Sequence, residues 1–416
     1  MERKTVKLLY FLLWTILLAG VSAIHSEAST ITPSDRVASS VPIREKPTAK
    51  STAIGKLERG KQIEYLGEVP NWYWVRLDAQ RKGYVHKAWT RFVNVADAGP
   101  ISPGFIAPLS TTKKPLEIHF IDVGQGDSTL LVCPNGNRIL IDAGSSAHGS
   151  RDDVRAYLLG VLDRGERTLT ALVVTHPDLD HYNFLPDILR GVTVKQLLRT
   201  GDEEDFDDKF VSWLHTIPAS RQQILYEKNY DKEDKPNPKL ACGDAKIHIL
   251  AAAIPTTRRG ASNFIKNSLS TVLMVRYGTF RAILTGDATF DTEDAILKRY
   301  SSDWLQSDIL KMGHHGSRST STSDEWATAV RPKIAIASAG YHSKHGHPSG
   351  EVVERLATFT VDHEAHPLTY AQGTSPYKWI EHEAYKEAIF STSDSGNIVI
   401  TTDGTKYDTR YVPFED

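Results

Sequence analysis

The sequence predicts an α/β layered domain that follows a small all-β unit, and two patterns support this. After about Leu116, short apolar runs of strand length alternate with helical patterns such as Arg151 to Leu162, as is typical of α/β layers. Between about Thr32 and Val95, β-branched and aromatic runs are separated by Gly, Pro and Asn, as is typical of a small β domain. A chain of 416 residues has room for two or three domains.

The composition excludes several classes of protein. Hydrophobic residues make up 40% and charged residues 24% of the chain, which excludes a disordered, collagen-like or coiled-coil protein. The net charge of −2 excludes a chain that is basic throughout, as many nucleic-acid binders are. However, Val41 to Val93 holds 11 basic and 5 acidic residues, whereas residues 94–416 hold 34 and 43. The opposite charges predict two units with different partners.

The N-terminus predicts export. Arg3, Lys4 and Lys7 precede the apolar run Leu8 to Ala19, and Val21-Ser22-Ala23 offers the small residues that signal peptidase accepts. We therefore expect a signal peptide within residues 1–27, with an uncleaved anchor as the alternative. No other stretch is apolar enough to cross a membrane, so the sequence predicts a secreted, periplasmic or wall-associated protein without a further membrane domain.

The N-terminal β unit resembles a known domain. Its segments Ile43-Arg44-Glu45-Lys46-Pro47, Trp74-Val75-Arg76-Leu77 and Gly83-Tyr84-Val85-His86 are similar to those of the bacterial Src-homology-3-like (SH3-like) barrel. The resemblance covers residues 32–96 and implies a targeting or binding role, often toward cell-wall polymers; a spacer that binds nothing is the alternative. The Pro- and Gly-rich residues 97–115 predict a linker, and residues 116–416 the second domain.

The strongest chemical signal lies in Thr175-His176-Pro177-Asp178-Leu179-Asp180-His181, directly after an apolar strand. Two imidazoles and two carboxylates within six residues suit zinc, manganese or iron. The alternative is helix capping, because Asp178 or Asp180 could cap a helix that begins near Tyr182. Capping would explain one carboxylate but neither histidine, so this segment predicts a metal site.

Three later strand candidates also end in residues that bind metals. Ala282 to Leu284 leads to Gly286-Asp287, and Ile309 to Met312 leads to His314-His315-Gly316-Ser317. Ile334 to Ser338 is followed by His345-Gly346-His347-Pro348. Each motif alone is weak evidence, since a Gly-Asp is usually a turn and a His pair is usually on the surface. Together they predict one site at the carboxyl edge of a sheet.

The order of these motifs, starting with Asp142-Ala143-Gly144, resembles the metallo-β-lactamase fold and in detail its ComEC-type branch, named for a bacterial DNA-uptake channel protein. The segment from His119 to Ser128 and the segment from Lys311 to Ser317 are the closest matches. The resemblance implies a four-layer αββα sandwich and one or two divalent metal ions, Zn or Mn. It suggests as ligands or immediate neighbours of the metal His176, Asp178, Asp180, His181, Asp287 and His315. It also implies that Asp142 orients a ligand, and that His314 or His347 faces the substrate.

The chain departs from the wider fold family in one respect. Many members place a metal-binding histidine between the His176 cluster and the Gly-Asp motif, but here only His215 and His248 lie in that interval. Asn267-Ser268-Leu269-Ser270 matches the ComEC-branch pattern instead, and the carboxylate-rich ligand set favours manganese. The Gly124-Gln125-Gly126-Asp127 turn either presents backbone amides to an anion or is simply a tight turn. Ser317 is expected to be a loop or substrate-contact residue.

These features predict an exported metal-dependent hydrolase. Divalent metals lower the pKa of bound water to about 7, so a phosphodiesterase or nuclease that acts through metal-bound hydroxide is expected, with Asp180 holding the water. His314 or His347 would stabilise developing charge. The substrate would be DNA or a phosphorylated wall polymer cleaved by an esterase; a lactonase or β-lactamase and an inactive wall-binding protein are the remaining alternatives. Cys133 and Cys242 are either one disulfide or two buried thiols.

Overall fold

The computed structural model describes residues 30–34, 37, 40–48, 51–69, 72–78, 81–93, 113–147, 149–163, 165–256 and 262–412. The expected signal peptide, residues 1–27, lies outside the described residues, and so does most of the expected linker, residues 97–115. In the ranges that are described, none of the helices combines the length and the apolar character needed to span a membrane.

The N-terminal unit is a seven-stranded all-β barrel with strand order β3-β2-β6-β5-β4-β1-β7. Its strands are β1 (Thr30–Pro33), β2 (Ser40–Arg44), β3 (Ala53–Glu58), β4 (Ile63–Val69), β5 (Trp72–Arg76), β6 (Lys82–His86) and β7 (Thr90–Val93). Ile31, Ile43, Val75 and Val85 fill its small core and are completely buried. The β-branched runs in the sequence therefore supply the inward side of each strand, as strand alternation requires.

The second unit contains two large sheets. The first has the order β15-β14-β12-β10-β9-β8-β24-β25 and the second the order β16-β17-β18-β19-β20-β23. The strands of the first sheet are β8 (Leu116–Phe120), β9 (Thr129–Val132), β10 (Arg138–Ile141), β12 (Ala171–Val174), β14 (Leu197–Arg199), β15 (Gln222–Ile224), β24 (Asn397–Thr402) and β25 (Tyr407–Val412). Those of the second are β16 (Lys246–Ala251), β17 (Val272–Tyr277), β18 (Phe280–Leu284), β19 (Ile309–Lys311), β20 (Ile334–Ala337) and β23 (Ile389–Ser391). A two-stranded sheet joins β11 (Thr168–Leu169) to β13 (Thr193–Val194), and a long hairpin joins β21 (Asp362–Gln372) to β22 (Lys378–Glu387).

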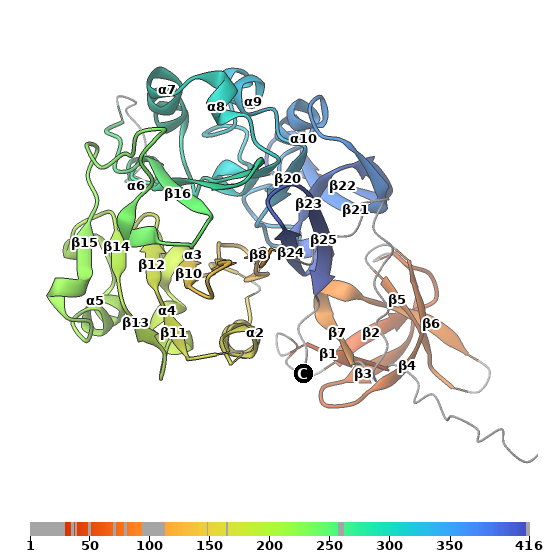
Figure 1. Cartoon of the computed structure of the whole chain (residues 1–416). Helices are drawn as coiled ribbons and strands as arrows, with labels where there is room; N and C mark the ends of the chain where they lie inside the picture. Colours follow the sequence, from red (N-terminus) through yellow and green to blue (C-terminus); the bar gives the residue numbers. More distant parts are fainter. Residues whose placement is uncertain are drawn as a thin grey trace, which may run out of the picture.

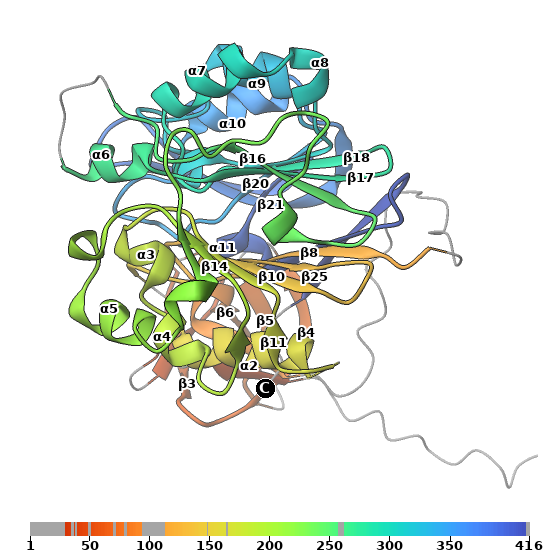
Figure 2. The ribbon, with the colours of Figure 1, turned by 60° about the vertical axis from the view of Figure 1, so that its left-hand side comes forward.

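Helices cover the outer face of both sheets, which confirms the predicted four-layer αββα sandwich (Figures 1 and 2). The first sheet is covered by α2 (Arg151–Leu162), α3 (Leu179–Tyr182), α4 (Leu185–Ile188) and α5 (Asp208–Leu214). The second is covered by α7 (Phe290–Arg299), α8 (Ser302–Leu305), α9 (Asp324–Val330) and α10 (Gly350–Ala357). Two further short helices are α6 (Ser262–Ser268) and α11 (Thr392–Ser395). The largest apolar cluster lies between the sheets and includes Phe120, Phe280 and Phe390.

The local predictions of the second unit hold closely. The helix expected over Arg151 to Leu162 has those bounds, and the Ser150 side chain caps it by accepting a hydrogen bond from the Asp153 backbone N–H. Parallel pairing of β10, β12 and β14 places their carboxyl ends at one edge of the first sheet. Parallel pairing of β18, β19 and β20 does the same in the second. The loops that carry the predicted metal ligands therefore leave both sheets at corresponding edges.

Cys133 and Cys242 form a disulfide that closes 109 residues of sequence and settles the alternative left open by the sequence. Cys133 follows β9 of the first sheet, and Cys242 precedes β16 of the second. Reduction should therefore lower the free energy of unfolding by about 2–5 kcal/mol, because the cross-link restricts a long loop of the unfolded chain. Urea unfolding of the oxidised protein and of a Cys133→Ser/Cys242→Ser variant measures the difference; equal midpoints would contradict this role.

The barrel packs against the second unit beside the β21–β22 hairpin (Figure 1). His86 Nε2 lies 2.8 Å from the Tyr341 hydroxyl oxygen, and the two rings are 4.6 Å apart. Tyr341 also donates a hydrogen bond to Glu381 of the hairpin. A second contact is the ion pair of Arg91 with Asp153, at 3.0 Å. Buried rings and paired charges hold the barrel in this position.

Docking of the barrel should weaken in acid. Burial lowers the pKa of His86 to about 4, although Glu381 opposes this shift. The docked state therefore favours neutral His86, so its contribution is complete above about pH 6.5 and is lost as the pH falls toward 4. Small-angle X-ray scattering should show a larger radius of gyration at pH 4.5 than at pH 7.5. The His86→Gln variant should have the same radius of gyration at both pH values. If its radius of gyration increases in acid as that of the wild type does, other groups control docking.

Candidate metal centre

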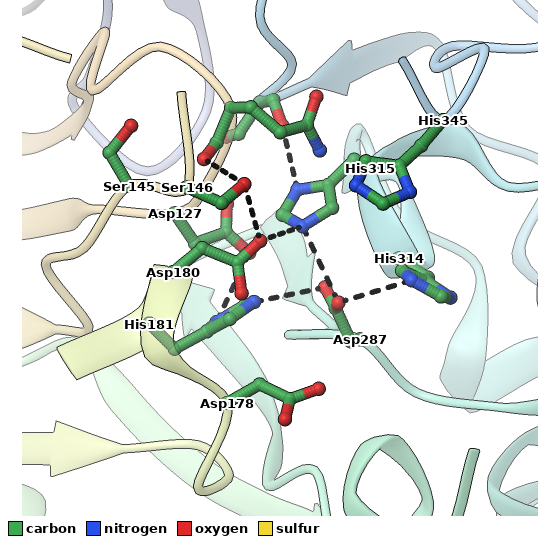
Figure 3. A network of polar contacts seen from close by, with 12 residues as sticks. Asp127, Ser145, Ser146, Asp178, Asp180, His181, Asp287, His314, His315 and His345 are labelled. Atoms are coloured by element: carbon green, nitrogen blue, oxygen red, sulfur yellow. Dashed lines mark hydrogen bonds and ion pairs between the residues drawn. The ribbon is translucent and has the colours of Figure 1, made fainter. Parts of the chain in front are cut away.

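The predicted ligands converge where the loops of the two sheets face each other (Figure 3). Four groups of side chains with metal-binding atoms are found among the described residues, and within each group these atoms lie within 4.8 Å of one another. The predicted residues in these groups are His176, Asp180, His181, Asp287 and His315, and two further members are Asp127 and Asp142. Loops after β10, β12, β18 and β19, and the loop between β8 and β9, supply these side chains.

Asp287 lies at the centre of the cluster and faces several imidazoles. Its Oδ1 is 3.3 Å from His181 Nε2, and its Oδ2 is 3.4 Å from His315 Nε2. The same Oδ2 is 3.6 Å from His314 Nε2 and 4.0 Å from His176 Nε2. Both oxygens of one carboxylate are therefore shared between histidines from both halves of the sandwich.

Hydrogen bonds orient two of the buried imidazoles, His181 and His315. His181 Nδ1 lies 2.8 Å from Asp142 Oδ2, and His315 Nδ1 lies 2.8 Å from the Ser338 carbonyl oxygen. A carbonyl only accepts, so His315 donates from Nδ1, and its Nε2 is the nitrogen that faces Asp287. The Asp142 carboxylate holds Nδ1 of His181 in the same way, so that Nε2 of His181 also faces Asp287. Asp142 therefore occupies the orienting position that the family resemblance implies for it.

The charges of the cluster are strongly coupled. Burial by itself lowers the pKa of His181, but the carboxylates of Asp287 and Asp142 outweigh it and raise that pKa well above its usual value. For Asp287 the balance is reversed: burial favours the neutral acid, while the neighbouring His315, His181 and His314 hold the pKa well below its usual value. The cluster thus stabilises negative oxygen beside positive charge, which is the electrostatic character of a cation site.

The loop that holds Asp180 and His181 packs against glycines. A Cβ on Gly126 would lie 2.2 Å from the Gly144 carbonyl oxygen and 2.6 Å from that of Asp180. Capping by Asp178, the alternative to a metal site, is not observed, because its side chain makes no capping hydrogen bond to α3. Instead, Asp178 Oδ2 lies 3.7 Å from His176 Nε2. The segment that carries Asp180 and His181 is therefore held against the cluster by close backbone packing, and the Asp178 carboxylate faces His176.

His314 and His347, expected to face the substrate, differ in exposure. The His314 side chain is 23% exposed, whereas His347 is 7% exposed. The His347 ring is 5.2 Å from that of His314 and 6.0 Å from that of His315. Thr320 Oγ1 lies 2.6 Å from His314 Nδ1, and burial lowers the pKa of His314 to about 4. Of the two, His314 lies closer to Asp287 and to solvent.

The remaining sequence candidates occupy other places. His215 pairs with Glu203 on the surface, and His248 packs edge-on against Trp304, so neither reaches the cluster. Ser270 Oγ accepts the Asp287 backbone N–H at 3.0 Å, and the Asn267 amide nitrogen lies 3.2 Å from His314 Nδ1. The Asn/Ser segment therefore supports the cluster. Ser317 is buried in its loop, with Oγ 3.4 Å from Ser319 Oγ.

Sequence reasoning missed two buried charges at the site, Asp127 and Lys311. Asp127 was considered only as part of a turn, but its Oδ2 lies 2.5 Å from Lys311 Nζ and 3.8 Å from His181 Nδ1. Lys311 also donates to the carbonyl oxygens of Gly286 and Met312. The available signal was a lysine inside the apolar run Ile309 to Met312, since buried lysines require a partner.

The residues of the cluster fit a divalent metal. His181 Nε2, Asp287 Oδ1 and His315 Nε2 are buried and form no hydrogen bond among the described residues. His181 Nε2 lies 3.3 Å from Asp287 Oδ1 and His315 Nε2 lies 3.4 Å from Asp287 Oδ2, and both separations are too long for good hydrogen bonds. They match the separation of about 3.3 Å expected for two ligands that each lie about 2.0 Å from one tetrahedral ion. Imidazole and carboxylate donors suit Zn or Mn.

Comparisons with known proteins assign the family. Residues 121–342, more than half of the chain, match the model of the metallo-beta-lactamase superfamily. The chain belongs to this superfamily. Residues 39–91 match the bacterial SH3 domain, which confirms the resemblance of the barrel. Metallo-β-lactamase folds bind divalent metals, in agreement with the cluster.

The curated relatives of the chain include proteins of bacterial competence. It is 30% identical over 259 residues to ComE operon protein 3 of Bacillus subtilis, covering 59% of this chain and 31% of that protein. It is 37% identical over 255 residues to competence protein ComA of Neisseria gonorrhoeae, covering 61% and 31%. The chain thus spans about a third of the length of these relatives. A solved metal-dependent hydrolase of the β-lactamase superfamily is 14% identical, with a TM-score of 0.34 and coverage of 59% of this chain and 93% of that one.

Proposed function

We propose that this protein is an exported metal-dependent phosphodiesterase that cleaves DNA. The observation that carries the proposal is the Asp287-centred cluster, which has an intact set of histidine and carboxylate donors in a chain similar to competence proteins. An inactive binding protein would be expected to lack ligands, whereas five of the six predicted ligand residues, all except Asp178, belong to the ligand groups found in the described residues. Export is supported by the disulfide and by the bacterial SH3 domain.

The residues proposed to hold metal are His176, His181, Asp287 and His315, with Asp178 and Asp180 beside them. A bound divalent ion would supply a Lewis acid and lower the pKa of its water to about 7. Asp142 and the Ser338 carbonyl fix the two imidazoles for this purpose. The Asp127–Lys311 pair fixes the strand end from which Asp287 projects, because Lys311 binds the Gly286 carbonyl oxygen.

Two side chains at the rim are proposed to act on the substrate. The Asp180 side chain is 21% exposed, with Oδ2 3.6 Å from His315 Nε2, so it can accept a proton from the attacking water. His314 is the better candidate of the two histidines for contact with a phosphoryl oxygen, because its side chain is partly exposed and Thr320 holds its ring.

A second candidate substrate is a phosphodiester-linked wall polymer. It is favoured by the bacterial SH3 domain, whose exported members often bind the cell wall, and by the acidic character of residues 94–416, which gains little from binding DNA. The chemistry at the metal centre would be the same for both polymers. The choice between them depends on what the rest of the chain binds.

The test incubates the purified protein with linear DNA and either Mn²⁺ or Zn²⁺, with EDTA in a parallel reaction. We expect cleavage that needs the metal and stops in EDTA. If the DNA stays intact while elemental analysis shows bound metal, the nuclease proposal is wrong, and phosphate-ester release from wall teichoic acid would then support the second candidate.

A further inference from the structure

The outer face of the barrel presents aromatic and basic side chains together. Val75 and Val85 point into the barrel core, so Trp74 of β5 and its cross-strand partner Tyr84 of β6 point outward. On the same face, Lys82 Nζ lies 4.5 Å above the Trp74 ring. Trp74 and Tyr84 are partly exposed and Lys82 is exposed. A cation beside open rings is the combination by which proteins bind a phosphate and its base.

This barrel face continues onto the second unit. The next outward pair along the strands is Trp72 and His86, whose rings lie 4.7 Å apart. His86 in turn contacts the Tyr341 ring at 4.6 Å. Two residues along a strand span about 7 Å, so Trp74 lies one step from this junction. Trp72 and His86 are themselves buried, so this junction connects the barrel to the rings of the second unit, while the exposed ring surfaces lie on either side of it.

In the second unit, the aromatic rings next to this junction form a stack. The Tyr341 and His342 rings are 4.0 Å apart at an interplanar angle of 11°, and His342 stacks on Trp379 at 4.6 Å and 19°. Beyond Trp379, the only further ring contact recorded among the described residues is Tyr377, which lies edge-on at 6.5 Å. Trp379 is partly exposed, so it can offer a ring surface to a base.

The stack adjoins the metal centre through one short loop. Tyr341 follows β20 by a few residues, and this loop supplies the Ser338 carbonyl that orients His315. The same loop carries His345, whose ring is 5.8 Å from that of His347, and Figure 3 shows His345 beside His315. A chain lying across the Tyr341–His342–Trp379 stack therefore has the metal centre beside it.

Charge along this path is favourable for a polyanion. Lys82 of the barrel lies over the Trp74 ring, and the exposed Lys344 follows His342 by two residues in the same loop. The nearby carboxylate of Glu381 is already engaged by the Tyr341 hydroxyl at 3.0 Å and by His342 Nε2 at 3.1 Å. Two exposed lysines thus accompany the path, although residues 94–416 are acidic overall.

We propose that the barrel face around Trp74 and the Tyr341–His342–Trp379 stack form one track that binds single-stranded DNA and leads it to the metal centre. The proposal rests on the proposed phosphodiesterase function and names its substrate as single-stranded. Bases of a single strand are free to stack on aromatic rings, whereas those of a duplex are already stacked. Wall polymers of phosphate-linked polyols have no flat rings, so the aromatic side chains favour nucleic acid.

The test measures binding by fluorescence anisotropy in EDTA, using labelled (dT)20 and an abasic oligonucleotide of equal length and charge. We expect the full chain to bind (dT)20 at least about tenfold more tightly than the abasic strand. Trp74→Ala and Trp379→Ala should each weaken (dT)20 binding by about tenfold and leave abasic binding unchanged, while Trp→Phe variants should restore most of the affinity. Lys82→Gln should weaken both probes and reduce the salt slope by about 0.7.

The matched control is Tyr226→Ala, an exposed tyrosine after β15 at the opposite edge of the molecule (Figure 1). It should bind both probes as the wild type does. Equal affinity for the two probes, or unchanged binding by both tryptophan variants, would overturn the track. Teichoic acid that competes as well as (dT)20 would assign the surface to a wall polymer instead. A protein that binds but does not cleave DNA with metal overturns only the proposed function, and one that cleaves without preferring bases overturns only the track.

Discussion

Asp287→Ala should abolish metal-dependent cleavage and lower the bound metal content. Asp287 is the side chain that both imidazole groups share, since its two oxygens face His181 and His315. Without Asp287, the histidines from the two halves of the sandwich lose the carboxylate that would bind the metal together with them. Loss of a metal removes several kcal/mol of charge stabilisation, so we expect the cleavage rate to fall by on the order of 10³-fold or more. Elemental analysis and an initial-rate assay on the same preparation measure both effects.

The matched control for this variant is Asp303→Ala. Asp303 is an exposed aspartate in the first turn of α8 and belongs to none of the ligand groups found in the described residues. It should retain both metal and activity. If Asp287→Ala also retained them, the cluster would not be the metal centre, and the inactive wall-binding interpretation of the chain would become the better one.

Much of this site could be predicted because each ligand follows an apolar strand in the sequence. The run Leu169 to Thr175 is followed directly by His176, and Ala282 to Leu284 ends three residues before Asp287; the structure has β12 and β18 at those places. Parallel pairing then brings such strand ends to one edge, so local pattern and sheet topology lead to the same residues. The family resemblance supplied the rest of the order.

Contacts between distant segments could not be predicted in this way. Asp127 precedes β9 in the first sheet, and Lys311 ends β19 in the second, so their pairing depends on how the two sheets face each other. The same holds for His86 and Tyr341, which belong to the barrel and to the second unit. A periodic pattern records which side of an element is buried, but not which other side chain meets it there.

Lys311→Met should destabilise the protein strongly even though methionine fills a similar space. Lys311 is 2% exposed, and its ammonium group contacts Asp127 and two backbone carbonyl oxygens. Removing it leaves a buried carboxylate without its cation, for which we expect a loss of about 3–5 kcal/mol in the free energy of unfolding. Urea unfolding at pH 7 in EDTA measures the loss.

Two further variants separate the ion pair from a general effect of losing a lysine. Lys333→Met breaks a pair of similar length, 2.6 Å to Asp308, but the Lys333 side chain is 55% exposed, so the cost should stay below about 1 kcal/mol. Adding Asp127→Asn to Lys311→Met removes the stranded charge and should recover a large part of the loss, because the two residues are coupled. If Lys311→Met and Lys333→Met lowered the free energy of unfolding equally, burial of the Asp127–Lys311 ion pair would not be what anchors Asp127 beside His181.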